Sequence, residues 1–239
     1  EKEMKHLFII NPAAGSRNQT EDYRKKIAQV CEAKGIDYSI RVSGAPGRCC
    51  KIAREAAQTG KEYRIYACGG DGTLNRFVNT VKDLEIKNPL YYFACGSGND
   101  FLRDVEHEDG LVSLAPYLEN LPTVFVQGKE YRFLNGVGYG IDGYCCEVGD
   151  KLRMQKPGEA INYTGIAIKG LLFHYKPVNA TVIVDGKEYR FKKVWLAPTM
   201  NGRFYGGGML PAPEQRREQP TVSVMVFHGT GKLKSLLIF

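Results

Sequence analysis

The sequence lacks any run of about 18 consecutive apolar residues, so no segment has the length and composition of a membrane-spanning helix. Its first apolar run, residues 7–10, is about four residues long, too short for the hydrophobic part of a signal peptide. The seven cysteines form no CxxC pair and no Cys/His finger, and the four histidines show no metal-ligand spacing. We therefore expect a cytoplasmic protein whose cysteines are reduced and buried as small hydrophobic residues.

Several nucleotide and hydrolase motifs are also missing. There is no Walker A sequence, GxxxxGK[ST], and no GxSxG nucleophile elbow anywhere in the chain. None of the strand-to-helix turns expected in the first half carries the Rossmann pattern GxGxxG. P-loop enzymes, dinucleotide dehydrogenases and serine hydrolases are thereby disfavoured.

The bulk composition is that of a packed globular protein. At 239 residues, with 43% hydrophobic and 25% charged residues, the chain fits one large domain or two small ones. Its formal net charge of +7 favours anionic partners, without choosing among nucleotide phosphates, acidic lipid headgroups and nucleic acid.

The first half alternates short apolar runs with helical periodicity. Strands are expected near residues 7–10, 38–42, 63–68 and 90–95, and helices near 20–34, 46–59 and 73–82. In the first helix, Tyr23, Ile27, Val30 and Cys31 fall on one face. Strands that alternate with helices of this length predict a parallel sheet covered on both faces, so we expect a three-layer α/β nucleotide-binding domain over residues 1–120.

The second half, residues 121–239, reads differently. Runs such as 181–184, 189–191, 194–197 and 221–227 are rich in β-formers and are separated by turn dipeptides, including Asp185-Gly186 and Gly128-Lys129. This pattern predicts an antiparallel sandwich-like domain or barrel with one helix at residues 161–173. Residues 233–239 read as the opening of an amphipathic helix with no end signal, so the natural chain is expected to continue.

Three glycine-rich or small-residue turns follow strands of the expected parallel sheet: NPAAGS at residues 11–16, GGDGTLN at 69–75 and GSGND at 96–100. Ligands of open parallel sheets bind beyond the carboxyl ends of the strands. Small residues let backbone N–H groups approach a polyphosphate, and a helix that starts near Thr73 adds its positive dipole end. The pattern predicts a nucleotide-phosphate site at this edge.

These residues resemble a known family. GGDGTLN at 69–75, NPAAG at 11–15 and GSGNDF at 96–101 match, in order and spacing, the motifs of the diacylglycerol kinase catalytic domain, which bacterial lipid kinases and sphingosine kinases share. LNGVGYGIDG at 134–143 resembles the link into that family's β domain, and GGGMLPAP at 206–213 resembles a later loop. The resemblance implies a lipid kinase that uses ATP and Mg²⁺.

The resemblance also implies a set of site residues. Asp71 would be the catalytic residue, either carrying Mg²⁺ or orienting the acceptor hydroxyl, while Ser43 and Ser97 stand where the family has threonines. The residues implied to hold the nucleotide are Asn11, Ser43, Gly69, Gly70, Asp71, Gly72, Thr73, Asn75 and Ser97.

The chain departs from the family pattern at several points. Arg76 replaces the usual Glu, Cys95 replaces a Pro, residues 124–126 lack a carboxylate, and residues 215–219 (QRREQ) lack the Asp that supplies a structural Mg²⁺ in bacterial relatives. The family's catalytic Glu lies in a late VDGE-like motif, expected beyond Phe239, so we expect the chain as given to be poorly active by itself. The similar VDGKE at 184–188 comes too early in the β domain and is interpreted as a hairpin turn.

The sequence therefore favours transfer of the γ-phosphate of ATP to a hydroxyl of diacylglycerol or a related lipid. Two alternatives stay open: an NAD kinase-like enzyme, which shares the GGDG loop, and a degenerate protein that binds nucleotide or lipid without turnover. We expect transient contact with the anionic inner face of a membrane, through residues 161–173 flanked by Lys151, Arg153, Lys156 and Lys176. A core helix is the other interpretation of residues 161–173. No nucleic-acid partner is expected, and a homodimer is left open.

Overall fold

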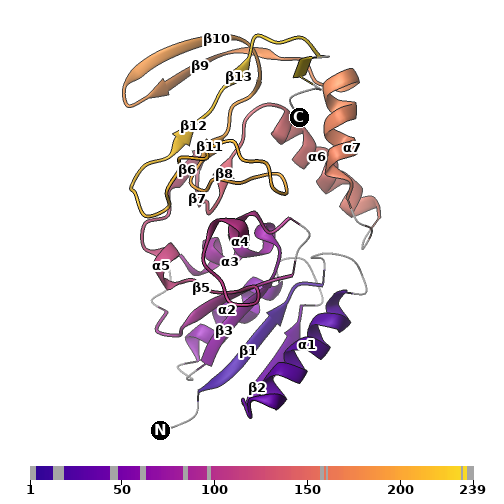
Figure 1. Ribbon diagram of the computed structural model, residues 1–239, viewed down its shortest axis with the longest axis vertical. Helices are drawn as coiled ribbons and strands as arrows, with labels where there is room; N and C mark the ends of the chain where they lie inside the picture. The colour runs from indigo at the N-terminus through magenta and orange to yellow at the C-terminus, as the bar shows by residue number, and fades with distance from the viewer. Residues whose placement is uncertain are drawn as a thin grey trace. The chain divides into compact units, whose positions relative to one another are not determined.

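Figure 1 shows the chain as a computed structural model, which describes residues 4–12, 19–43, 48–59, 63–82, 86–95, 98–156, 159, 161–232 and 234–235. These residues belong to two compact units, one spanning residues 1–135 and 201–221 and the other 136–200 and 222–239. The domain boundary expected after residue 120 stays a prediction. The helix expected at 233–239 lies almost wholly outside the described residues.

The first unit is built on a five-stranded sheet with the strand order β2-β1-β3-β4-β5. Its strands are β1 (Lys5–Ile10), β2 (Tyr38–Val42), β3 (Tyr63–Gly69), β4 (Leu90–Ala94) and β5 (Leu111–Ser113). The first four strands are parallel, as expected. The fifth was not expected and pairs antiparallel with β4, because a turn at Asp109 and Gly110, both at positive φ, reverses the chain directly before it.

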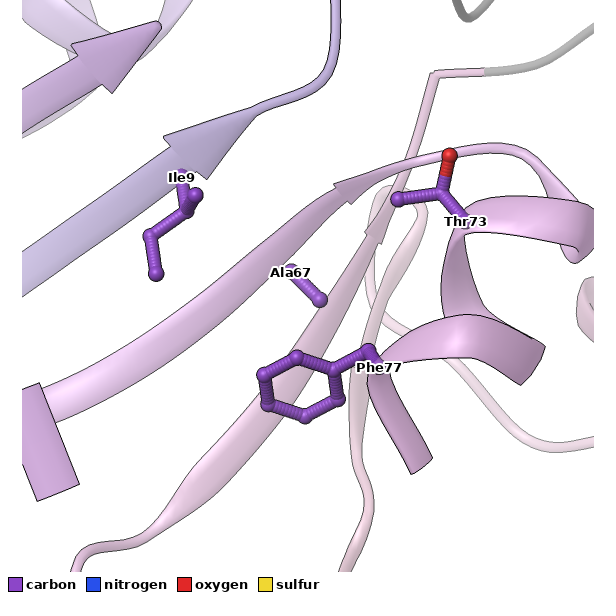
Figure 2. A pocket seen from close by; sticks show the side chains of 4 residues that line it. All are labelled: Ile9, Ala67, Thr73 and Phe77. Atoms are coloured by element: carbon purple, nitrogen blue, oxygen red, sulfur yellow. The ribbon is translucent and has the colours of Figure 1, made fainter. Parts of the chain in front are cut away.

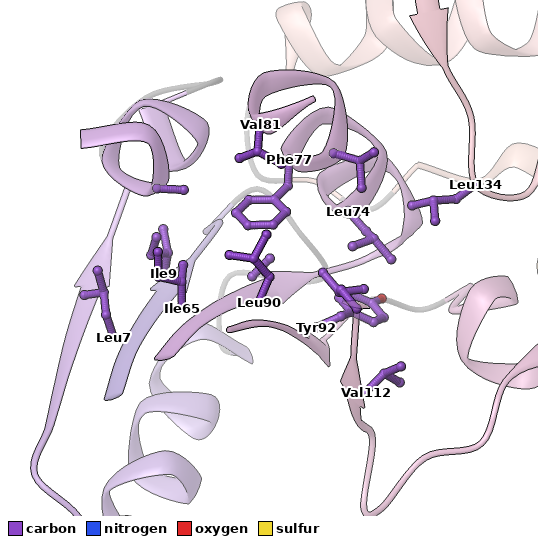
Figure 3. Packing of buried hydrophobic residues seen from close by; sticks show 14 of the residues in the cluster. Leu7, Ile9, Ile65, Leu74, Phe77, Val81, Leu90, Tyr92, Val112 and Leu134 are labelled. Atoms are coloured by element: carbon purple, nitrogen blue, oxygen red, sulfur yellow. The ribbon is translucent and has the colours of Figure 1, made fainter. Parts of the chain in front are cut away.

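Helices cover both faces of this sheet, which confirms the three-layer α/β prediction. They are α1 (Gln19–Ala33) on one face and α2 (Arg48–Gln58) and α3 (Asp71–Val81) on the other. Alternate residues of each strand face opposite layers: Leu7 and Ile9 of β1 pack with α2 and α3 (Figure 3), whereas Phe8 and Ile10 pack against α1. Val30, expected on the buried face of α1, is 44% exposed.

After the sheet, the first unit continues through two short helices and a hairpin. These are α4 (Asp100–Asp104), α5 (Ala115–Leu118), β6 (Thr123–Val126) and β7 (Lys129–Arg132). The side chain of Asn79 in α3 holds the hairpin, because its Nδ2 donates to the Arg132 carbonyl at 2.7 Å and its Oδ1 accepts from the Arg132 N–H at 2.8 Å. Residues 201–221 return to this unit from the second one.

The second unit holds two three-stranded sheets and a helical segment. Both sheets are antiparallel. One contains β8 (Gly136–Val137), β11 (Thr199–Met200) and β12 (Ser223–Val224). The other contains β9 (Val178–Val184), β10 (Lys187–Leu196) and β13 (Phe227–His228). Asp185 and Gly186, at φ of 49° and 77°, join β9 to β10, so VDGKE is a hairpin turn as interpreted.

The helical segment of the second unit differs in part from the expectation. The helix expected at 161–173 exists as α7 (Tyr163–Lys169), which continues into the π-helical turn η1 (Gly170–His174). The preceding helix α6 (Ile141–Gln155) was missed, because Gly143 and Gly149 interrupt its pattern. In the part of the chain that the structure describes, no helix combines the length and apolar character needed to cross a bilayer.

Burial is described for five of the seven cysteines, since the side chains of Cys49 and Cys50 lie outside the described part of the structure. Cys31, Cys68 and Cys95 are buried free thiols, as expected, whereas Cys145 is half-buried and Cys146 is exposed. The expectation of burial is therefore wrong for Cys146, which lies on the solvent side of α6.

Candidate functional site

Four strand ends meet at one edge of the first sheet. Ile10 at the end of β1 lies in register with Val42 of β2 and Cys68 of β3, and Gly69 lies in register with Ala94 of β4. The chain places β2 on one side of β1 and β3 on the other, so the strand order switches direction between β1 and β3. Crevices at such switch points, outside the carboxyl ends, are where open α/β sheets bind ligands.

The GGDG turn connects β3 to α3 at this switch point. Gly70 is the N-cap of α3 in an extended conformation (φ −95°, ψ −175°) and, as a glycine, has no side chain with which to cap the helix. Gly69 must lack a side chain, because a Cβ there would lie 2.6 Å from Cβ and Oγ1 of Thr73. Among the described residues, a Cβ on Gly72 would meet no atom within 4 Å. This part of the chain therefore leaves room at the uncapped helix N-terminus, which suits an anion.

Asn11 ties the tip of β1 to this helix. Its Nδ2 donates to Oγ1 of Thr73 at 2.8 Å, so the two turns on either side of the switch point are joined directly. A void of about 10 Å³ lies beneath Thr73, lined by Ile9, Ala67 and Phe77 (Figure 2). Figure 2 shows the Thr73 hydroxyl pointing away from the apolar side chains. This void has room for about one water molecule, so it is a packing defect and not the ligand site.

Ser43 follows β2 at the same edge and is 1% exposed. Its backbone N–H donates to the Ile10 carbonyl at 3.0 Å, but its Oγ has no hydrogen-bond partner among the described residues. A buried hydroxyl without a partner costs about 1–3 kcal/mol, so a water molecule or a ligand that completed its hydrogen bonding would stabilise this edge.

Replacing Ser43 with alanine is expected to affect the free and the nucleotide-bound protein in opposite directions. The free protein should keep or gain stability, by up to about 1 kcal/mol, because the unpaired hydroxyl is removed. The rise in melting temperature that ATP produces should shrink, which differential scanning fluorimetry with and without ATP measures. Ser39→Ala, at an exposed position of β2, is the control and should change neither quantity. An unchanged ATP shift in Ser43→Ala would exclude Ser43 from the site.

Asp71 opens α3 and accepts three hydrogen bonds. Its Oδ2 accepts from the Asp100 N–H at 2.9 Å, and its Oδ1 accepts from the Phe101 N–H at 2.9 Å and from Nδ2 of Asn135 at 3.0 Å. The carboxylate thus caps the N-terminus of α4, and all three groups that donate to it are uncharged. Because a carboxylate has about four acceptor positions, one on Oδ2 stays available. The catalytic role of Asp71 stays a prediction.

Asn75 and Ser97 were also expected to hold the nucleotide, and the structure describes only the first of them. Oδ1 of Asn75 accepts from the Leu134 N–H at 3.3 Å, so this part of its side chain holds the segment after β7. Ser97 and Gly96 lie outside the described residues. Gly98 is described, and a Cβ there would lie 3.4 Å from Oδ2 of Asp71, which places the third glycine-rich turn beside the carboxylate.

Sequence reasoning missed a polar cluster next to Asp71. The Asp104 side chain is 3% exposed, and its carboxylate accepts hydrogen bonds from Nε of Arg203 and Nε of Arg217, each at 2.6 Å. Asp100 accepts from the Gly207 N–H at 2.8 Å, and burial raises its pKa above the usual range. The Gly206–Gly208 loop belongs to the first unit, together with Asp100 and Asp104. No local pattern marks these contacts, because they join residues about 100 positions apart.

The second unit contains a partly buried carboxylate that was not expected from the sequence. Asp142, in the first turn of α6, has neither an ion pair nor a hydrogen bond within the described part of the chain, and burial raises its pKa to about 6. The surrounding GYGIDG at 138–143 has the spacing GxGxxG, but packing explains two of its glycines. A Cβ on Gly138 would clash with Oδ2 of Asp142. A Cβ on Gly140, which has a φ of 98°, would lie 2.3 Å from the carbonyl oxygen of Trp195.

Asp142 should make the stability of the protein fall as the pH rises. The native carboxyl, with a pKa of about 6, binds a proton more tightly than the unfolded one near 3.8, so stability is highest below about pH 4 and declines up to about pH 6. Asp142→Asn should flatten this part of the curve and stabilise the protein at pH 7 by on the order of 2 kcal/mol. Urea unfolding at pH 4.5, 6 and 7.5 measures it, and parallel curves for the two proteins would contradict it.

Comparisons with known proteins agree with this geometry. The profile of the diacylglycerol kinase catalytic domain matches residues 5–121, and that of the YegS C-terminal NAD kinase beta sandwich-like domain matches residues 135–239. A diacylglycerol kinase of Bacillus subtilis is 27% identical over 230 residues, covering 92% of this chain and 72% of that protein. One of Mycobacterium tuberculosis is 24% identical over 245 residues, covering 97% and 75%.

A solved structure shows the same fold. The crystal structure of a diacylglycerol kinase from Bacillus anthracis superposes with a TM-score of 0.62 at 22% identity, covering 98% of this chain and 76% of that one. The two profiles together account for both halves of the sequence, and the glycine-rich turns lie where the first profile matches. Residues 5–121 therefore belong to the diacylglycerol kinase catalytic domain family, and residues 135–239 to the YegS C-terminal domain family.

Proposed function

We propose that the protein transfers the γ-phosphate of ATP to a hydroxyl group of diacylglycerol or a related lipid. The observation that carries this proposal is the Gly69–Thr73 turn, which opens an uncapped helix N-terminus at the switch point between β1 and β3. Phosphoryl transfer requires positioning and charge stabilisation and little covalent chemistry by the protein. Backbone N–H groups, one carboxylate and a few hydroxyl and amide groups are enough for it.

The residues at this edge fit a nucleotide and its metal. α3 begins at Asp71 without a side-chain cap from Gly70, so the N–H groups at its start are donors from which phosphate oxygens would accept. The unpaired Ser43 hydroxyl and the Asn11 amide flank that space, and the remaining acceptor position of Asp71 suits Mg²⁺, which proteins bind through one or two carboxylates plus substrate phosphates. When bound, Mg²⁺ would neutralise charge on the transferred phosphoryl group.

Contact with an anionic membrane is a second part of the proposal. In the second unit, Met154 of α6 and Phe173 of η1 are 76% and 74% exposed, which suits insertion into the headgroup region. Lys151, Arg153 and Lys156 each form an ion pair with an acidic side chain three or four residues away, which weakens their attraction to anionic lipid. The apolar side chains are therefore expected to contribute most of the affinity.

Vesicle co-sedimentation tests the membrane proposal. Phe173→Asp should lower the bound fraction of full-length protein on phosphatidylglycerol vesicles about tenfold, because it removes an inserted ring and adds repulsion. Ile183→Asp, at a 67% exposed position of β9, is the matched control and should leave binding unchanged. Equal loss in both variants, or no binding by the wild type, would exclude this surface.

The activity itself is tested with radiolabelled ATP offered to the full-length protein. Label on a lipid of a total lipid extract, and above all on added diacylglycerol, is the expected result. Label on NAD would replace the proposal with an NAD kinase activity. Nucleotide binding without any labelled product would assign the chain to a degenerate, binding-only role.

A further inference from the structure

Arg217 is a buried cation at the centre of the polar cluster beside Asp71. Its side chain is 7% exposed, and its guanidinium lies 4.9 Å from the centre of the Phe101 ring. Nε donates to Oδ2 of Asp104 at 2.6 Å, Nη2 donates to Oδ1 of Asn135 at 2.8 Å, and Nη1 donates to the Leu134 carbonyl. All three sides of the guanidinium fork are thus engaged, which fixes its orientation.

The negative charge of Asp104 alone does not explain why Arg217 is buried here, because a second arginine already neutralises that charge. Arg203, whose side chain is 41% exposed, donates from Nε to Oδ1 of Asp104 at 2.6 Å, and its backbone N–H donates to Oδ2. Among the hydrogen bonds of the described residues, none joins Arg203 to Asn135. The two arginines therefore share one carboxylate, but Arg217 also contacts the amide that reaches Asp71.

The contact with Arg217 determines which way the Asn135 amide faces. Because Oδ1 of Asn135 accepts from a cationic donor, the amide cannot flip without setting its NH₂ group against the guanidinium N–H groups. Nδ2 must then point at Asp71, where it donates to Oδ1 at 3.0 Å. The backbone carbonyl of Asn135 is also held, since it accepts from the N–H groups of Asn201 and Gly202.

We propose that Arg217 is a positioning residue of the candidate kinase site, which acts through Asn135 to hold the Asp71 carboxylate in register with the start of α4. This inference rests on the proposed function for its catalytic consequence. Asp71 accepts the amide and both α4 N–H groups only in one orientation, and that orientation leaves the remaining Oδ2 acceptor position beside Gly98. Arg217 thereby sets the direction in which the free acceptor position points.

The test compares Arg217→Met with Arg203→Met, because each removes one arginine from Asp104 but only the first releases Asn135. Hydrogen exchange of the Asp100 and Phe101 amides, measured in full-length protein without nucleotide or lipid, should speed up about tenfold in Arg217→Met. The exchange rate of these two amides should stay at the wild-type value in Arg203→Met.

In the lipid kinase assay, kcat should fall about 10²-fold for Arg217→Met with a smaller change in the KM for ATP. The kcat of Arg203→Met should stay within about twofold.

A conservative variant and a mutant cycle keep the test decisive. Arg217→Lys keeps the charge beside Asp104 but cannot also reach Leu134 and Asn135, so it should fold and reproduce the faster exchange. In an Asn135→Ala background, Arg217→Lys should add no further loss of kcat. The inference is overturned if both Arg217 variants exchange at the wild-type rate, or if Arg203→Met causes the same change. Absence of lipid product with wild-type protein would instead refute the proposed function, while the exchange comparison would still show whether Arg217 holds Asp71.

Discussion

Replacing Asp71 with asparagine is expected to slow lipid phosphorylation by the full-length protein about 10²-fold, because it removes the one negative charge at the GGDG turn and displaces the atoms around it. The same change should lower the free energy of unfolding by about 1–3 kcal/mol. An asparagine keeps a single oxygen, whereas the carboxylate accepts from the N–H groups of both Asp100 and Phe101 and from Asn135. Turnover of lipid with radiolabelled ATP, together with urea unfolding, measures the two effects.

A variant of the same helix separates these effects. Val81→Ala removes two methyl groups from a buried position of α3, so a loss of stability of about 1–3 kcal/mol is expected without any change at the turn. Assayed well below both melting temperatures, it should retain turnover close to that of the wild type. If Asp71→Asn also retained it, Asp71 would be a structural cap of α4 and not a catalytic residue.

Replacing Gly69 with alanine should damage both the fold and the nucleotide site. The new Cβ would lie 2.6 Å from Cβ of Thr73, which rotation of the threonine side chain cannot move away. The first turn of α3 must therefore shift, at a cost of about 1–3 kcal/mol, and its bond to Asn11 should weaken. We expect a lower melting temperature and at least a tenfold weaker affinity for ATP, measured by isothermal titration calorimetry.

Gly72→Ala is the matched comparison, because its Cβ would lie within 4 Å of no atom in the part of the chain that the structure describes. Alanine in a helix is favoured over glycine, so the free protein should gain about 0.4–1 kcal/mol of stability. Affinity for ATP should nevertheless fall, since the Cβ would occupy space in which a phosphate approaches the backbone. An unchanged affinity in Gly72→Ala would show that the phosphates bind away from this turn.

Much of the first unit could be predicted from the sequence because its signals are local. The apolar runs that form β1 to β4 and the periodic segments that form α1 to α3 each fix their own element to within about two residues. The glycines of the GGDG turn could be selected for the same reason, since only the next turn of the same helix requires Gly69 to lack a side chain. Elements with weak local patterns, such as β5 and α6, were missed.

The support of the site could not be predicted, because it depends on residues distant in sequence. Residues 215–219 could be seen to lack the Asp that supplies a structural Mg²⁺ in bacterial relatives, but nothing in that stretch shows that the Arg217 side chain is buried while Arg216 is exposed. The contact of Arg217 with Asp104 spans 113 positions, and that of Asn135 with Asp71 spans 64. Only folding brings these polar residues together, so the hydrophobic pattern of the sequence does not indicate their contacts.

The return of residues 201–221 to the first unit has a consequence for how such a gene can change. A recombination breakpoint between codons 136 and 200 separates Asp104 from both of its arginines, leaving a buried carboxylate without a counter-charge. Chimaeras joined there should misfold unless both parents carry the same arrangement. The two halves are therefore expected to have been inherited together rather than exchanged as independent modules.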